Sequence, residues 1–230
     1  MTATTSEPPG AAYGGEHGPG PDGRRWEVRA VTLTDPLAQP LLRELEYEYS
    51  TRYPSPEGTS REMARYPPEE FEPRCGGLLL LLLRDGAPVS GGAFRRYDPR
   101  TAELKRIWTH SGHRRQGLAR RVVAELERAA AAAGYERVYL TTGPRQPEAK
   151  GLYLVTGYTP LFDVTADPES LGTPLPFAKR LVGAEPIAPG EFPPPPRRAR
   201  FGPAPAPVPA GSAEAATGSV NPSAPAERQR

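Results

Sequence analysis

The chain has 230 residues, and its 29 basic and 27 acidic residues leave a formal net charge of +2. This near balance argues against a nucleic-acid-binding surface that covers the whole chain, although it leaves open a local basic patch at Arg114, Arg115, Arg120 and Arg121. Cys75 is the only cysteine, which excludes an intramolecular disulfide and a cysteine cluster for zinc. The length allows one or two domains.

The two ends of the chain differ from its middle, because most of the 31 prolines and 24 glycines lie in them. Residues 1–24 and 184–230 lack core-forming residues and are predicted to be disordered, which leaves one domain over residues 25–183. Pro193–Pro196 and the arginines after it match a polyproline ligand, but a solvated tail is the favoured interpretation.

No targeting or membrane segment is recognised. Residues 1–24 lack the apolar stretch of a signal peptide, and the leucine run 78–83 is far shorter than the roughly 20 residues that span a bilayer. We therefore expect a cytoplasmic protein without a membrane partner. The leucine run itself predicts a fully buried central strand.

Hydrophobic periodicity and turn residues predict the secondary structure in chain order. The expected elements are a strand at 25–31, a helix from Pro36 or Pro40 to about Tyr53, at most one short helix near 60–66, strands at 77–84 and 87–97 joined by the hairpin turn Asp85-Gly86, a strand at 102–109, a helix from about 118 to 133, a strand at 137–142, a further helix, and a closing edge strand at 177–182. This order predicts an α/β fold in which a mixed, mostly antiparallel central sheet is flanked by helices.

The turn between the strand 102–109 and the next helix reads Arg114-Arg115-Gln116-Gly117-Leu118-Ala119. The first N–H groups of a helix are unpaired and carry partial positive charge. Glycine allows a ligand to approach the backbone closely. The turn therefore predicts a binding site for a phosphate or pyrophosphate, although neither the dinucleotide fingerprint nor the P-loop is present.

The same turn resembles the signature of the GNAT acetyltransferase family, whose three defined positions are filled by Arg114, Gly117 and Ala119. A second motif of that family is similar to the segment 146–158, in which the matching residues are Ala149, Leu152, Tyr153, Gly157 and Tyr158. Gln146 stands where the family often has Asn. The resemblance extends over about residues 25–182.

The resemblance implies a GNAT-like acyl-CoA acyltransferase fold, acetyl-CoA as co-substrate and no metal. The pyrophosphate would bind the turn, and the strand before it would bind the pantetheine arm and offer one N–H to the thioester carbonyl. The residues expected to bind acetyl-CoA are Ile107, Trp108, Thr109, Arg114, Arg115, Gln116, Gly117, Leu118, Ala119, Gln146 and Ala149.

Two catalytic residues are expected. Tyr153 is the candidate acid, because a phenol with a pKa of about 10 stays protonated at neutral pH and can donate to a thiolate. The alternative interpretation is that Tyr153 is a tyrosine packed in the core. Glu103 is the candidate base, and strand alternation places it on one face with Lys105, Ile107 and Thr109. A salt bridge between Glu103 and Lys105 is an equally open interpretation.

The function implied is transfer of an acetyl group from acetyl-CoA to a primary amine, by direct attack in a ternary complex. The acceptor is a small amine or a peptide, and a homodimer is left open. Residues suggested to line the acceptor site are Tyr47, Tyr49, Tyr53, Arg106 and Trp108. The alternatives are a non-catalytic acyl-CoA-binding module and a basic scaffold or nucleic-acid-binding protein, which no aromatic-interleaved basic stretch supports.

Overall fold

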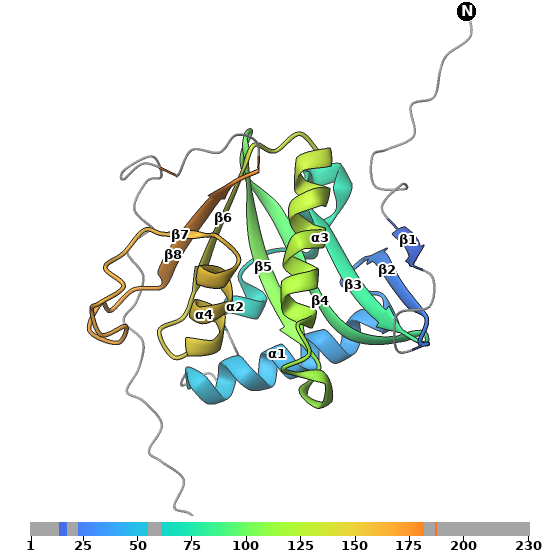
Figure 1. The fold of residues 1–230 in the computed structure, drawn as a ribbon, viewed down its shortest axis with the longest axis horizontal. Helices are drawn as coiled ribbons and strands as arrows, with labels where there is room; N and C mark the ends of the chain where they lie inside the picture. The colour runs from blue at the N-terminus through green and yellow to red at the C-terminus, as the bar shows by residue number, and fades with distance from the viewer. Residues whose placement is uncertain (1–13, 18–22, 55–60, 182–186, 188–230) are drawn as a thin grey trace, which may run out of the picture.

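The computed structural model describes residues 14–17, 23–54, 61–181 and 187, and its centre is an eight-stranded sheet in the order β1-β2-β3-β4-β5-β6-β8-β7 (Figure 1). The strands are β1 (Gly14–His17), β2 (Trp26–Val31), β3 (Leu78–Arg84), β4 (Ala87–Asp98), β5 (Thr101–Thr109), β6 (Arg137–Thr142), β7 (Thr159–Pro160) and β8 (Leu175–Arg180). The helices are α1 (Gln39–Arg52), α2 (Arg61–Ala64), α3 (Leu118–Ala132) and α4 (Pro147–Val155), with short 3-10 turns η1 (Pro36–Ala38), η2 (Pro68–Phe71), η3 (Pro73–Cys75) and η4 (Ser111–His113). The predicted fold class is confirmed.

The leucine run forms β3, and all six leucines are buried. Leu78, Leu80 and Leu82 belong to the core that contains the apolar stripe of α3, whereas their odd-numbered neighbours belong to the core under α1. Figure 1 shows α3 lying across the strands on one face of the sheet. A strand with six consecutive leucines is therefore stable here because helices cover both of its faces.

The hairpin between β3 and β4 has the predicted turn. Asp85 and Gly86 both have positive φ, 51° and 83°, which matches the twist of the flanking strands. Further along, the register of β4 against β5 shifts between Gly91 and Ala93. A Cβ on Gly92 would lie 2.6 Å from the Ile107 side chain, so this position needs glycine.

The register shift changes which residues of β5 share a face. Arg106 takes a left-handed φ of 58°, and the simple alternation ends there. Ile107 packs against the α3 core, while Trp108 is buried in the α1 core. The prediction that Ile107 lies on the same face as Glu103 and Lys105 is therefore wrong, because the extra residue of a bulge reverses the side-chain alternation.

The sheet opens between β5 and β6, two neighbouring strands that run parallel to each other. β5 and β6 pair in register only from Thr101 with Arg137 to Glu103 with Tyr139. Both strands continue beyond these residues without pairing with each other, and β6 pairs along its full length with β8 on its other side. The strands thus separate toward the ends that precede α3 and α4.

Three features near the ends of the expected domain differ from what composition and pattern indicated. β8 is not an edge strand, because β7 pairs with it on the side away from β6. Gly14–His17, within the tail predicted to be disordered, pairs with β2. Ile187 lies beyond the predicted boundary at residue 183 but is 4% exposed and packs with Tyr139 and Ala178. Pro193–Pro196 and the arginines after it lie outside the described residues.

Candidate active site

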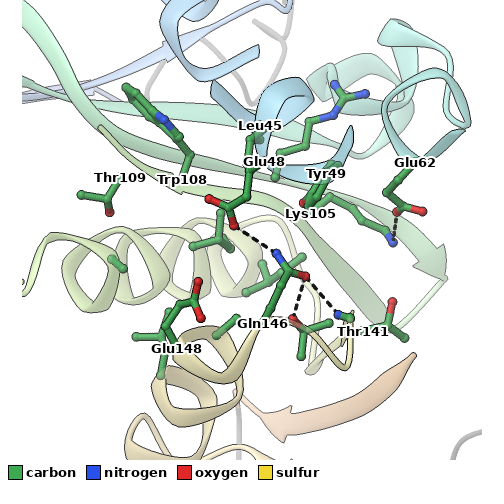
Figure 2. Close-up of a pocket in the computed structure, with 18 of the residues that line it drawn as sticks. Leu45, Glu48, Tyr49, Glu62, Lys105, Trp108, Thr109, Thr141, Gln146 and Glu148 are labelled. Atoms are coloured by element: carbon green, nitrogen blue, oxygen red, sulfur yellow. Dashed lines mark hydrogen bonds and ion pairs between the residues drawn. The ribbon is translucent and has the colours of Figure 1, made fainter. Parts of the chain in front are cut away.

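A cavity of about 1150 Å³ lies where β5 and β6 separate, and α1, α2, α3 and α4 contribute to its walls. This volume is slightly above the range of about 300–1,000 Å³ that is usual for ligand pockets. Figure 2 shows Glu48 of α1 and Gln146 at the start of α4 pointing toward each other across it. The cavity therefore brings together segments that are far apart along the chain, since Glu48 and Gln146 are 98 residues apart.

The turn before α3 forms one end of the cavity. Gly117 has a φ of 75°, and no side chain caps the first turn of the helix. A Cβ on Gly117 would meet nothing within 4 Å, so the backbone is open at this point. Leu118, Ala119 and Arg120 also line the cavity. This arrangement is a helix N-terminus that can bind an anion.

The side chains of the turn go in different directions. Arg114 lines the cavity and donates from Nη2 to Oε2 of Glu48 at 3.2 Å, with half of its side chain exposed. Arg115 also lines the cavity, with a left-handed φ of 62°. Gln116 does not line it, and its side-chain oxygen is 3.4 Å from a guanidinium nitrogen of Arg84. Of the residues expected to bind the cofactor, Gln116 is the one that the structure places away from the cavity.

The end of β5 forms a wall of the cavity, with Ile107, Trp108 and Thr109 all lining it. Trp108 is 3% exposed, and its indole N–H donates to Oε2 of Glu44 on α1 at 2.9 Å. The same carboxylate accepts from the backbone and the hydroxyl of Ser111 in η4. Glu44 thereby ties the end of β5 and the following turn to α1.

Tyr153 of α4 also lines the cavity and is 6% exposed. Its ring packs against those of Tyr158 and Phe177, with centroid distances of 5.5 and 5.6 Å. Burial raises the pKa of Tyr153 above its ordinary value, so the phenol keeps its proton at neutral pH. Its charge, when formed, would also raise the pKa of Tyr49, whose own burial is the larger cause.

Gln146 connects three parts of the site. Its side-chain oxygen accepts from the Gly143 N–H at 3.1 Å and is 3.2 Å from the Thr142 hydroxyl. Its amide nitrogen donates to Oε1 of Glu48 at 3.4 Å. Ala149 lies one turn further along α4 and also lines the cavity. Both Gln146 and Ala149 therefore lie at the cavity.

Glu103 is 4% exposed and is not among the residues that line the cavity. Its carboxylate binds Arg95 at 2.9 Å and Lys105 at 3.1 Å. The structure thus contains the salt bridge that the sequence left open. Burial alone would lower the pKa of Lys105, but the charges of Glu103 and Glu62 outweigh it and raise the pKa above its ordinary value.

Four of the five residues suggested for the acceptor site line the cavity. Tyr49, Tyr53, Arg106 and Trp108 line the cavity, whereas Tyr47 is 73% exposed and does not. The Tyr53 hydroxyl accepts from the Arg145 N–H at 2.9 Å. It lies so close to Gly143 that an added Cβ would be 1.9 Å away, which requires glycine there.

Several lining residues had not been predicted from the sequence. They include Glu48, Glu62, Met63, Tyr66, Lys105, Thr141, Thr142 and Gly143. One of them had a recognisable pattern: Glu48 follows Leu41 and Leu45 at helical spacing, so it is a charge on the buried stripe of an amphipathic helix. The threonines at the end of β6 had none, because only the separation of β5 from β6 exposes them to the cavity.

Two further features were sought among the described residues. In that part of the chain, no group of three or more His, Cys, Asp or Glu side chains is arranged to hold a metal ion. Within the same ranges, no helix combines the length and apolar character needed to cross a membrane.

Known proteins resemble this chain in sequence and in fold. The uncharacterized N-acetyltransferase YsnE of Bacillus subtilis (strain 168) is 33% identical over 93 residues, which are 38% of this chain and 62% of that relative. A Klebsiella pneumoniae protein described as an acyl-CoA N-acyltransferase has a TM-score of 0.53 at 23% identity, covering 68% of this chain and 98% of that one. The GNAT domain of S. lividans PAT has a TM-score of 0.53 at 16% identity, covering 74% and 98%.

At these identities the solved structures establish a shared fold. The sequence itself carries the family assignment, because residues 41–158 match the acetyltransferase (GNAT) family. The matched range contains β5, the turn before α3, and α4, and each of these elements contributes residues to the cavity wall. The chain belongs to the GNAT acetyltransferase family.

Proposed function

We propose that this protein is an N-acetyltransferase that transfers an acetyl group from acetyl-CoA to a primary amine. The observation that carries the proposal is the single cavity that contains both the uncapped N-terminus of α3 and the Tyr153 phenol. An anion-binding turn and a proton donor in one space are what transfer from an acyl-thioester requires.

The residues present fit acetyl-CoA. The open backbone at Gly117 and the exposed guanidinium of Arg114 suit a pyrophosphate, since backbone N–H groups and arginine both donate to phosphate oxygens. The wall formed by residues 107–109 suits the pantetheine arm and can offer a backbone N–H to the thioester carbonyl. Gln146 and Ala149 would contact the same arm from α4.

The reaction proceeds by direct attack in a ternary complex. The amine nitrogen attacks the thioester carbonyl carbon, a C–N bond forms, and the C–S bond breaks. The nitrogen loses one proton and the leaving thiolate gains one. Tyr153 is suited to donate that second proton, because its phenol lines the cavity and carries its proton at neutral pH.

The proton of the amine needs a different acceptor from the one that the sequence suggested. Glu103 does not line the cavity and is paired with Arg95 and Lys105, so a role as base is not assigned to it. Lys105 remains charged and cannot accept a proton. Glu48 and Glu62 are carboxylates that line the cavity, and either can take the proton directly or through water.

The test is to supply acetyl-CoA and a panel of amines and to follow thiol release. Amine-dependent thiol release with an acetylated product would support the proposal. Tight CoA binding without turnover on any amine would favour the alternative of a non-catalytic acyl-CoA-binding module. Strongly salt-dependent binding to random DNA would instead favour the scaffold or nucleic-acid alternative.

A further inference from the structure

Arg106 is a buried cation that the proposed chemistry does not use. It is 8% exposed and lines the cavity, and its guanidinium lies 4.3 Å from the centre of the Phe71 ring. Nη2 donates to the carbonyl of Met63 in α2 at 3.1 Å. Nη1 is buried and has no hydrogen-bond partner.

The neighbouring cations, unlike Arg106, are paired with carboxylates. Arg95 binds Glu103 and Glu70, and Lys105 binds Glu103 and Glu62. Glu62 acts on Arg106 through space, but its carboxylate is bonded to Lys105 at 3.0 Å. Burial, the largest effect, lowers the pKa of Arg106, yet a guanidinium remains charged at neutral pH.

A buried guanidinium nitrogen without a partner is costly, because desolvation of a charged donor is not offset. The backbone of Arg106 adds to this cost, since its φ of 58° lies in a region that arginine rarely adopts. Strain of this kind occurs mostly at binding and catalytic sites. Packing against Phe71 alone would be served by an uncharged side chain.

We infer that Arg106 binds a carboxylate of the acceptor, which makes the acceptor a small amino-carboxylate, of which an amino acid is the simplest kind. This inference rests on the proposed function. A planar guanidinium matches a carboxylate with two parallel hydrogen bonds, and Nη1 has its donors free.

The position of Arg106 relative to the reacting groups agrees with a small acceptor. Arg106 belongs to β5, Tyr49 to α1 and Tyr153 to α4. All three side chains line the same cavity. A molecule that carries its amine near Tyr153 can therefore place a carboxylate toward Arg106. The carboxylate reaches Nη1 by a rotation of the buried guanidinium toward the cavity.

The test compares α-amino acids with their own carboxamides and decarboxylated amines as acceptors for the wild-type protein. We expect the acids to have a kcat/KM about 10 to 100 times higher than their amides, the range for one charge-assisted contact. Arg106→Gln should raise the KM of the acids by a similar factor and leave the amides unchanged. Arg106→Lys should restore part of the preference.

Arg65→Gln is the matched control, because it removes another cation from the cavity lining, and it should keep the ratio of acid to amide. Calorimetric binding of acids and amides to the CoA-saturated protein gives a second readout that needs no turnover. Binding of acids that depends on Arg106, without turnover of any amine, would support the inference and refute the acetyltransferase proposal. Wild-type protein that prefers amides or simple amines, or that binds no acid, would overturn the inference.

Discussion

Glu48 of α1 accepts a hydrogen bond from Arg114 of the turn before α3, with 3.2 Å between Oε2 and Nη2. The same carboxylate accepts from Gln146 at 3.4 Å and lies 3.6 Å from Arg52. One acidic side chain thus holds the arginine that the family motif assigns to pyrophosphate. A ligand that bears phosphate would compete with Glu48 for Arg114.

Arg114→Ala should therefore weaken CoA binding, by about 1.5–3 kcal/mol for a charge-assisted contact. Glu48→Gln should strengthen it by up to about fivefold, because a partly exposed ion pair is worth about 0–1 kcal/mol and would no longer compete. Calorimetric titration of both variants with CoA measures these changes. In the double variant the gain from Glu48→Gln should disappear, and an undiminished gain there would show that Glu48 does not act through Arg114.

Gly117→Glu should abolish CoA binding, because a carboxylate would stand in the phosphate site at the N-terminus of α3. Gly117→Ala is the control: its Cβ meets nothing within 4 Å, so only the left-handed φ opposes it, at a cost of about 1–2 kcal/mol. Thermal melting and CoA titration of both variants separate binding from folding. A folded Gly117→Glu protein with normal CoA affinity would remove the cofactor assignment.

Tyr153→Phe keeps the packed ring and removes only the hydroxyl. If Tyr153 is the acid, kcat should fall by about 10²–10⁴-fold while CoA affinity and Tm change little. Tyr158→Phe is the matched control, because this neighbouring ring contacts Tyr153 but does not line the cavity. Steady-state kinetics on any accepted amine gives the answer, and normal turnover by Tyr153→Phe would exclude the phenol from the reaction.

Glu44 should make stability depend on pH. Burial raises the pKa of Glu44, but hydrogen bonds from Trp108 and Ser111 outweigh it, and the pKa is lowered in the folded state. Its stabilisation is then present above the unfolded value of about 4.3 and is lost as the pH falls through the folded value.

At pH 7, Glu44→Gln should therefore cost about 1.5 kcal/mol, the lower end for hydrogen bonds to a charged group. The difference from wild type should shrink below about pH 4.3. Urea denaturation at pH 7, 5, 4 and 3 measures it, with the exposed Glu69→Gln as control. A difference that stayed constant down to pH 3 would contradict this role of Glu44.

The domain should extend beyond residue 183. Ile187 is 4% exposed and packs with Tyr139 and Ala178, and burying such a side chain is worth about 1.5–3 kcal/mol. A fragment of residues 14–187 should therefore be more stable in urea than residues 25–183, and Ile187→Asp should remove the part of the gain that Ile187 supplies. Equal stability of the two fragments would restore the boundary expected from composition.

Local sequence patterns predicted most of the helices and strands and the two motifs. Leu78–Leu83, Asp85-Gly86 and the turn at Gly117 act through local rules, namely burial pattern, turn geometry and helix start, and each formed as predicted. The match to the second motif predicted that Tyr153 belongs to the site, and the residue does line the cavity. Its position in a helix alone would have been equally typical of a core residue.

The residues that surround the cavity depend on the tertiary structure. The bulge at Arg106 reverses the side-chain alternation of β5, so Ile107 lies on the opposite face of the sheet from Glu103. The separation of β5 from β6 brought Glu48 and Gln146 into one cavity. Register and pairing depend on contacts between distant segments, so periodicity within one strand cannot supply them. The same long-range contacts decide which cations are paired with a carboxylate. They leave Nη1 of Arg106 without a hydrogen-bond partner.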